Sequence, residues 1–431
     1  MPYLVVNGGK KLRGEITNQP AKNSAVAILC ASMMIPGKTI LSDVPQIEEV
    51  NRILELLASL GVKIEKLGPG KLSLDASKNL NFNNIDKHAS EVTRSSLLLL
   101  GALASRPVSY KIYKSGGCRL GERTVRPHLY ALESFGVSVV SKQKFYEVKN
   151  SPLRAAQIVM YESGDTPTEN AIMAAVLAPG KSIIRMASAN YMVQDLCYFL
   201  RQAGAKIEGV GTTTLSIEGV KALKSAVNYS IMPDPIAAMT FLSAAIVTGS
   251  HLTVKNCPMD FLDLELYKLE KMGQKLQVKN ERGGKFRMAD IEVWPSSLKA
   301  LPDKIYGRPF PGLNIDNLPL FVPILAKAKG RTLVHDWAYE NRSVYSLELQ
   351  KLGAKITLLD LHRAWVEGPT KFKANEVVCP PALRPAVNVL ICMLAAKGKS
   401  ILRNTYVIDR GYENVYDILN SAGADIKVVK E

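Results

Sequence analysis

Apolar and polar positions along this chain follow one motif that recurs six times in 431 residues. An apolar, alanine-rich run ends at a glycine, a β-branched strand follows, and a helix then ends in the pattern Leu-x-x-x-Gly. The apolar runs predict helices buried on every side, because hydrophobic residues occupy all of their faces. Alternating segments such as 205–210 and 214–219 predict strands with one buried face and one exposed face.

Nearly constant separations between the two glycines of each unit support the repeat. The second glycine is typical of a helix C-cap, where a left-handed backbone is cheapest without a Cβ. A sixth unit ends at Gly136, and its first turn at Arg106-Pro107 lies about 30 residues upstream, so this copy contains an insertion. The other pairs are Gly37 with Gly61, Gly180 with Gly204, Gly249 with Gly273, Gly330 with Gly353 and Gly398 with Gly423.

Six such units exceed what one hydrophobic core holds, since cores stop growing near about 250–300 residues. We therefore expect an α/β protein of two domains, each built from three βαβαββ-like repeats. The expected division assigns 22–231 to one domain and 1–21 plus 232–431 to the other, with the first strand, 3–6, closing a sheet of the second domain. Two crossings between the domains would allow a hinge, and the cleft between them is the expected ligand site.

Composition narrows the class of protein. An apolar fraction of 47% with 22% charged residues is typical of globular proteins. The N-terminus lacks the features of an export signal, and the uncharged stretch 235–254 fits a repeat better than a membrane span. Six scattered cysteines without a Cys-x-x-Cys pair predict a reduced, cytoplasmic protein. The five histidines show no ligand spacing, so neither a metal nor another cofactor is expected.

The formal net charge of +16 admits two interpretations. The simpler is a lysine-rich solvated surface. Basic runs interleaved with aromatic residues are missing from the sequence, so we do not expect a nucleic-acid partner. The functional interpretation is a small anionic substrate held by arginines from separate segments.

The insertion in the Gly136 repeat is the loop Ser115-Gly-Gly-Cys118-Arg-Leu-Gly-Glu-Arg123. Its glycines let the backbone bend, and its arginines surround one cysteine, conditions that make a thiol reactive near neutral pH. Insertions confined to one repeat usually form functional loops. A glycine-rich turn with an incidental thiol is the simpler alternative.

Charged and polar residues recur where loops meet the apolar helices of successive units. Taken singly, most would be capping or surface residues. Their recurrence at equivalent ends of the repeats predicts that they converge. They are Lys22, Asn23, Arg94, Thr168, Glu169, Asn170, Asp316, Arg342, Arg384 and Arg410.

Five motifs stand out along the chain: Ala21-Lys22-Asn23, Gly116-Gly117-Cys118 with Arg123, Thr168-Glu169-Asn170, Tyr339-Glu340-Asn341-Arg342 and Ile408-Asp409-Arg410-Gly411-Tyr412-Glu413. Together they resemble the enolpyruvyl transferases of the UDP-N-acetylglucosamine 1-carboxyvinyltransferase kind, and the resemblance covers essentially the whole chain. It implies an inverse α/β barrel (prism) architecture with buried helices. The related shikimate-pathway synthase is disfavoured, because its Gly-Asn-Ala-Gly-Thr signature is missing.

The resemblance implies transfer of the enolpyruvyl group of phosphoenolpyruvate to the 3-hydroxyl of UDP-N-acetylglucosamine in peptidoglycan synthesis, by a fosfomycin-sensitive monomer or weak homo-oligomer. Asp316 would be the general base, Cys118 the acid at the methylene carbon, and Lys22 a further catalytic residue. Phosphoenolpyruvate would be bound by Lys22, Arg94, Arg123, Arg342, Arg384 and Arg410. The nucleotide sugar would be bound by Asn23, Arg94, Arg123, Thr124, Val125, Arg126, Gly164, Asp165, Thr166, Asp316 and Tyr339.

Departures from the family pattern leave alternatives open. Ala382 stands where relatives carry an aspartate. Arg126 and residues 164–166 differ from the motifs with which relatives bind the uridine and the diphosphate of the acceptor. Residues 189–192 replace an Arg-Glu-Pro-Glu stretch. One alternative keeps the chemistry with another uridine nucleotide, such as UMP, as acceptor. Another is a catalytically weak homologue that binds nucleotide in a regulatory or structural role.

Overall fold

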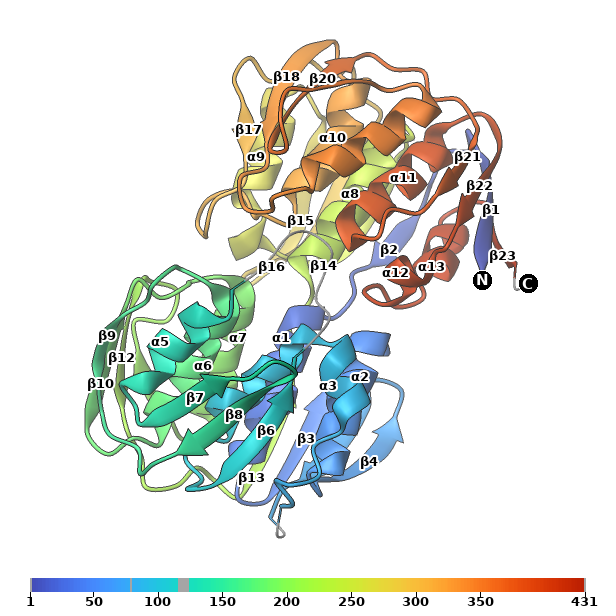
Figure 1. The fold of residues 1–431 in the computed structure, drawn as a ribbon. Helices are drawn as coiled ribbons and strands as arrows, with labels where there is room; N and C mark the ends of the chain where they lie inside the picture. Colours follow the sequence, from blue (N-terminus) through green and yellow to red (C-terminus); the bar gives the residue numbers. More distant parts are fainter. Residues whose placement is uncertain (1, 78–79, 115–123, 430–431) are drawn as a thin grey trace. The chain divides into compact units, whose positions relative to one another are not determined.

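The computed structural model describes residues 2–77, 80–114 and 124–429. These residues fall into two compact units. The central unit comprises the described residues from Pro20 to Met232, and the terminal unit comprises those up to Gln19 and from Pro233 onward. In each unit, sheets surround a group of helices (Figure 1). The expected class, an α/β protein of two units with buried helices, is confirmed.

The described strands of the central unit form three sheets, one for each repeat. In two of them a parallel strand lies at one edge, and the remaining pairs are antiparallel. The third, three-stranded sheet belongs to the repeat that contains the insertion. The strand orders are β13 (Ala226–Ser230), β3 (Lys38–Ser42), β5 (Lys71–Asp75), β4 (Lys63–Gly68); β6 (Ser109–Tyr113), β8 (Phe145–Asn150), β7 (Val137–Ser141); and β11 (Lys206–Glu208), β12 (Thr214–Glu218), β10 (Lys181–Arg185), β9 (Gln157–Val159).

The terminal unit also has three sheets among its described residues. Strand β1 (Tyr3–Gly8) pairs with both β22 (Gly398–Arg403) and β23 (Ile426–Val429), so the first strand completes a C-terminal sheet as expected. The strand orders are β21 (Glu376–Val378), β22, β1, β23; β15 (Leu276–Arg282), β16 (Met288–Val293), β14 (Leu252–Pro258), β2 (Glu15–Thr17); and β17 (Ile305–Tyr306), β18 (Gly330–His335), β20 (Arg363–Gly368), β19 (Lys355–Leu358).

Five apolar helices form the interiors of the two units. Every residue of α8 is buried, and the other four are buried over almost their whole length, which confirms the expectation from their alanine-rich sequences. Small side chains let these helices approach closely, and the sheets cover their outer faces (Figure 1). The five are α1 (Lys22–Ala31), α6 (Asp165–Val176), α8 (Pro235–Val247), α10 (Leu318–Lys327) and α11 (Leu383–Ala395).

Shorter or amphipathic helices complete the two units. The glycines expected at the helix C-caps all have positive φ, for example 94° at Gly61 and 91° at Gly353. The α-helices are α2 (Glu48–Ser59), α3 (Lys87–Val92), α4 (Leu99–Ala102), α5 (Arg126–Glu133), α7 (Tyr191–Gln202), α9 (Asp263–Lys271), α12 (Tyr406–Asp409) and α13 (Val415–Ser421). The 3₁₀ helices are η1 (Ser32–Met34), η2 (Arg94–Leu98), η3 (Met259–Phe261) and η4 (Ser343–Leu352).

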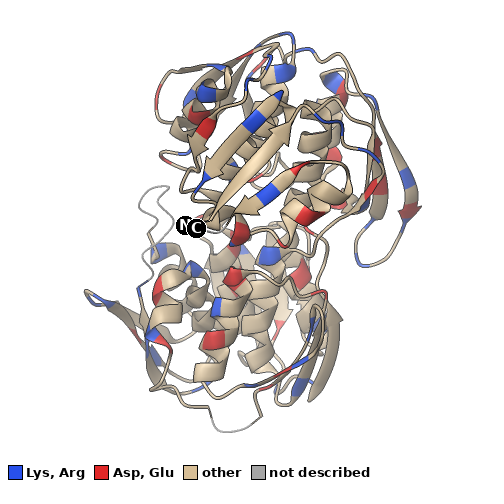
Figure 2. Cartoon of the chain, turned by 90° about the vertical axis from the view of Figure 1, so that its right-hand side faces the viewer, with Lys and Arg blue, Asp and Glu red and all other residues tan. Residues whose placement is uncertain are grey.

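Two further features concern the charged residues and the lengths of the helices. Lysines and arginines are spread over the strands and loops of both units on the side drawn in Figure 2, interspersed with acidic residues. Within the described ranges, each helix is too short or too polar to cross a bilayer.

Candidate active site

In the central unit, the first turn of α1 presents Lys22 and Asn23, both half-buried. Asn23 Nδ2 donates to the hydroxyl of Tyr191 at 3.0 Å. Tyr191 opens α7, and its side chain is fully buried. The N-termini of α1 and α7 are therefore joined by a side-chain hydrogen bond.

A second set of bonds connects the start of α7 to the start of α6. The N-cap Asn190 accepts from the backbone N–H of Tyr191 at 2.9 Å, and its Nδ2 donates to Asp165 at 3.2 Å. Ser188 Oγ donates to the other carboxylate oxygen of Asp165 at 2.6 Å. Asp165 follows the N-cap Gly164, so its charge is also favoured by the positive end of α6.

His128 of α5 joins the same end of α6. Its Nδ1 lies 2.8 Å from Asn170 Nδ2, and its Nε2 lies 3.3 Å from Thr166 Oγ1. Burial, with a smaller contribution from Arg94, lowers the pKa of His128 to about 3. The ring is therefore neutral at pH 7, and since Nδ1 accepts from the amide, the proton is on Nε2 and faces Thr166.

Arg94 is half-buried at the start of η2, and its Nη2 donates to the carbonyl of Thr124 at 3.0 Å. The buried Glu49 accepts hydrogen bonds from the hydroxyls of the two residues that flank Arg94, Thr93 and Ser95. This carboxylate fixes the backbone on both sides of Arg94. Val125 and the exposed Arg126 follow Thr124 at the N-terminus of α5.

The Thr-Glu-Asn motif lies inside α6 and is buried. Thr168 Oγ1 donates to Gly164 O at 2.7 Å and accepts from the N–H of Ser188 at 3.0 Å. Burial, and secondly the charge of Asp165, raise the pKa of the Glu169 carboxyl well above its ordinary value. The motif supports the surrounding helix ends from within.

In the terminal unit, Asp316 lies in the turn that leads into α10. Its N–H donates to Asn314 Oδ1 at 2.9 Å. The buried Glu265 of α9 accepts from the N–H of Asn314 at 3.1 Å and from Asn317 Nδ2 at 2.9 Å. Two hydrogen bonds to the buried Glu265 thus hold the turn that carries Asp316. Burial raises the pKa of the Glu265 carboxyl.

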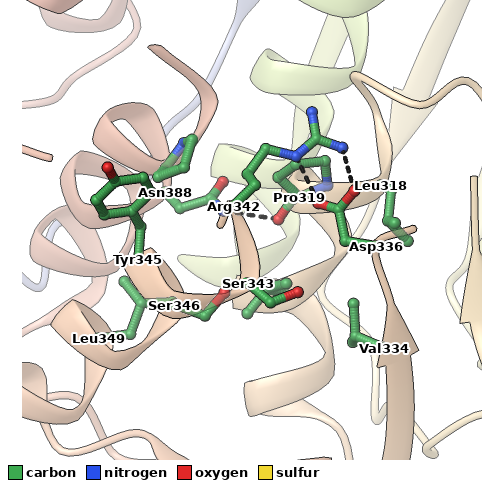
Figure 3. A pocket seen from close by; sticks show the side chains of 12 residues that line it. Leu318, Pro319, Val334, Asp336, Arg342, Ser343, Tyr345, Ser346, Leu349 and Asn388 are labelled. Atoms are coloured by element: carbon green, nitrogen blue, oxygen red, sulfur yellow. Dashed lines mark hydrogen bonds and ion pairs between the residues drawn. The ribbon is translucent and has the colours of Figure 1, made fainter. Parts of the chain in front are cut away.

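Arg342 binds Asp316 and is itself held by Asp336, and Figure 3 shows the pair of Arg342 and Asp336. Its Nη1 lies 3.3 Å from Asp316, while Nε and Nη2 donate to the two oxygens of Asp336, the latter at 2.9 Å. Nη2 also donates to Ile315 O at 2.6 Å, and the guanidinium lies 4.1 Å from the ring centre of Tyr339. A substrate anion that binds Arg342 has to compete with these groups.

Arg384, in the first turn of α11, approaches the other oxygen of Asp316 at 3.7 Å. Its Nη1 donates to Tyr412 Oη at 2.6 Å, and that hydroxyl lies 2.7 Å from Thr240 Oγ1. Thr240 donates in turn to Ile236 O at 2.8 Å, so the hydrogen bonds run in one direction from Arg384 into α8. Arg384 is thereby directed toward Asp316.

A small cavity lies beside the Arg342–Asp336 pair, between α10, η4 and α11 (Figure 3). Its walls are mostly apolar, with Leu318 and Val334 among them, and Asn388 lines it as well. Asn388 Nδ2 donates to Pro319 O at 2.7 Å. The cavity leaves room for small adjustments of the buried ion pair.

The expected residues therefore form one group in each unit. The central group contains Lys22, Asn23, Arg94, Thr124, Asp165 and Thr166, and the terminal group contains Asp316, Tyr339, Arg342 and Arg384. Arg410 is exposed at the end of α12. Cys118 and Arg123 lie outside the described residues.

Sequence reasoning missed several side chains that orient these groups. Tyr191 is the first residue of α7, as Lys22 is of α1, and comparing helix starts across the repeats would have found it. Asp336 directly follows strand β18 and precedes the Tyr339–Arg342 motif, which is a weak signal in the sequence. His128, Glu265 and Glu49 act through contacts distant in sequence, which no local pattern reveals.

The arrangement suits anions rather than metal ions. Helix N-termini and guanidinium groups supply positive potential for phosphate or carboxylate oxygens. Among the described residues, His, Cys, Asp and Glu side chains form no group of three or more that could hold a metal ion.

The fold is one that solved enolpyruvyl transferases share. The solved structure of the enolpyruvyl transferase NikO from Streptomyces tendae superposes with a TM-score of 0.87 at 23% identity, covering 100% of this chain and 99% of that one. EPSP synthase from Acinetobacter baumannii gives a TM-score of 0.77 at 19% identity, with both chains fully covered. At these identities the likeness shows the fold.

Sequence comparison shows the family. The EPSP synthase (3-phosphoshikimate 1-carboxyvinyltransferase) family model matches residues 6–419. The chain is 32% identical over 432 residues to the UDP-N-acetylglucosamine 1-carboxyvinyltransferase of Trichlorobacter lovleyi, covering 100% of each chain. The chain belongs to this family of 1-carboxyvinyl, or enolpyruvyl, transferases.

Proposed function

We propose that this protein transfers the enolpyruvyl group of phosphoenolpyruvate to the 3-hydroxyl of UDP-N-acetylglucosamine and releases inorganic phosphate. The observation that carries the proposal is the full-length similarity to a transferase named for this acceptor. The geometry around Asp316 supports the same chemistry, because it supplies a carboxylate among cationic groups. The reaction would be the first committed step of peptidoglycan precursor synthesis.

The donor is a small, highly charged anion. Lys22, Arg123 and Arg410 would bind its phosphate and carboxylate, with charge-assisted hydrogen bonds that are stronger than neutral ones. The buried Arg384 adds positive charge beside Asp316. The N-terminal ends of α1 and α6 contribute favourable dipoles for the phosphates of donor and acceptor.

The transfer would proceed by addition and elimination. The acceptor oxygen bonds to C2 of phosphoenolpyruvate while Asp316 takes the hydroxyl proton and Cys118 delivers a proton to C3. The tetrahedral ketal then loses a proton from C3, and its C2–O bond to phosphate breaks, giving the enol ether and phosphate. A free thiol has a pKa of about 8.5, a value at which an acid can stay protonated near neutral pH and still give up its proton at modest cost.

The proposal assigns the proton-accepting role to Asp316 alone, since Ala382 is buried at the N-cap of α11. Asn23, Thr166 and Asp165 would contribute to acceptor binding in the central unit, and Arg342 would act on the reaction by orienting Asp316.

An acceptor screen tests the proposal. Purified protein is mixed with phosphoenolpyruvate and either UDP-N-acetylglucosamine or UMP. The released phosphate is measured, and the mass of the product is determined by mass spectrometry. We expect phosphate and an enolpyruvyl adduct with UDP-N-acetylglucosamine. Turnover of UMP alone would overturn the acceptor. Nucleotide binding by calorimetry with no phosphate release, even at high protein concentration, would instead indicate a binding protein.

A further inference from the structure

We propose that Tyr191 is a positioning residue that fixes the carboxamide of Asn23 for the acceptor, an inference that rests on the proposed function. Tyr191 lies in the stretch 189–192, where this chain departs from the family pattern. Its hydroxyl accepts a hydrogen bond from Asn23 Nδ2 at 3.0 Å.

Tyr191 and Asn23 differ in solvent exposure, and this difference decides which of the two side chains is fixed and which can move. The side chain of Tyr191 is fully buried, whereas Asn23 is half-buried in the first turn of α1, next to Lys22. The tyrosine ring cannot swing away without opening the packing between α1 and α7, so the hydroxyl is the fixed partner. The amide is the adjustable one.

The hydrogen bond decides which way the amide faces. The two ends of a carboxamide have similar size but opposite hydrogen-bonding character, so an unrestrained amide turns over easily. With Nδ2 donating to Tyr191, Oδ1 of Asn23 lies at the opposite edge of the amide plane. That edge presents a hydrogen-bond acceptor, which suits a hydroxyl or amide N–H of the acceptor substrate other than the reacting 3-hydroxyl, whose one proton goes to Asp316.

Tyr191 is in turn held by hydrogen bonds at the start of α7. Asn190 accepts from its backbone N–H and donates to Asp165, which Ser188 also binds. Asp165 opens α6, so the chain of bonds runs from α6 through α7 to Asn23 of α1. Removing the hydroxyl of Tyr191 breaks the hydrogen bond to Asn23, and the hydrogen bonds from Asn190 and Ser188 to Asp165 remain.

A double-mutant cycle tests the inference with the full-length protein. Tyr191→Phe, Asn23→Ala and the double variant are assayed by phosphate release with phosphoenolpyruvate and UDP-N-acetylglucosamine. We expect Tyr191→Phe to lower kcat/KM for the acceptor about 5- to 10-fold, the worth of one hydrogen bond, while the KM for phosphoenolpyruvate stays unchanged. In the Asn23→Ala background the same change should have no further effect.

Tyr110→Phe is the matched control, since Tyr110 is a buried tyrosine of the same unit whose hydroxyl donates to Leu99 O instead. It should leave acceptor kinetics unchanged. Asn190→Ala gives a second measurement if Tyr191→Phe fails to fold, because it removes the cap that holds Tyr191. Because Asn190 also binds Asp165, only the part of its loss that acts through Tyr191 should vanish in the Asn23→Ala background.

The outcomes separate this inference from the proposed function. Additive effects of the two variants, or an unchanged acceptor kcat/KM in Tyr191→Phe while Asn23→Ala is impaired, overturn the inference and leave the function standing. Wild-type protein that releases no phosphate with this acceptor overturns both.

Discussion

The carboxylate of Asp316 lies 3.3 Å from Nη1 of Arg342, a guanidinium that is only 2% exposed. Arg384 approaches its other oxygen at 3.7 Å. Arg342 is held by Asp336, and Arg384 is held by Tyr412, so the two guanidinium groups fix the position of the Asp316 carboxylate. The proposed reaction therefore depends on precise placement of the acceptor hydroxyl beside this carboxylate.

Asp316→Asn removes the proton acceptor and keeps the size of the side chain. We expect kcat to fall about 10²- to 10⁴-fold, the usual contribution of general base catalysis, with nucleotide binding nearly intact. Phosphate release measures the first quantity, and calorimetry with the nucleotide sugar measures the second. Asp360→Asn, which removes an exposed carboxylate bound to Arg363, is the control. Unchanged turnover in Asp316→Asn would exclude it as the base.

Asp336→Ala tests the buried partner of Arg342. Because the guanidinium would remain buried with its main counter-charge gone, we expect the free energy of unfolding to fall by about 3–5 kcal/mol. Urea denaturation measures the change. Asp260→Ala removes the partner of Arg287, an exposed pair of the same unit, and should alter stability little. Equal effects from both variants would mean that the buried pair contributes no more than a surface one.

His128 predicts a specific dependence of stability on pH. Its folded pKa of about 3 lies below the unfolded value of 6.5, so the unfolded chain binds more protons between these values. His128 therefore makes its full contribution to the free energy of unfolding above pH 6.5. Below pH 6.5 this contribution decreases by about 1.4 kcal/mol for each pH unit.

Denaturation curves of wild type and His128→Gln at pH 7 and pH 5 measure this contribution. The variant should lose less stability than the wild type on acidification, whereas His88→Gln, at an exposed histidine, should behave like the wild type. Parallel loss in wild type and His128→Gln would show that His128 is not the group that titrates.

Cysteine chemistry offers a selective test of Cys118. The five cysteines that the structure describes are buried free thiols, and burial raises their pKa, to about 12 for Cys197 and Cys379. Low thiolate content makes them unreactive. Fosfomycin, an epoxide that mimics phosphoenolpyruvate, should therefore add once per chain.

Intact-mass analysis in the presence of the nucleotide sugar measures the adduct. Cys118→Ser should abolish it and lower turnover strongly, while Cys379→Ser should leave it unchanged. An adduct that persists in Cys118→Ser, or an unmodified wild-type chain, would remove Cys118 from the proposed mechanism.

The sequence predicted the fold in some detail because its repeat is local. The glycine spacing, the apolar runs and the alternating segments each depend on neighbouring residues, and the structure has the corresponding helices and sheets. Strand β1 was also predicted, since an unpaired first strand next to six complete repeats needed a partner.

The candidate site was less accessible to sequence reasoning. Helix starts could be located, and with them Lys22, Arg94 and Asp316. Their hydrogen-bonding partners could not, because Tyr191 is 168 residues from Asn23 and Glu265 is 49 from Asn314. Pairings over such separations depend on how repeats pack against one another, which periodicity does not encode.

The position of strand β1 between β22 and β23 has a consequence for synthesis on the ribosome. Gly8 pairs with Gly398, so the N-terminal strand must wait for about 390 further residues before its sheet can form, roughly 20–80 s at ordinary translation rates. The strands of the central unit all lie within residues 38–230 and can pair long before then. The nascent chain thus carries an unsatisfied hydrophobic strand ahead of a finished domain, and shielding by chaperones would matter most for those first residues.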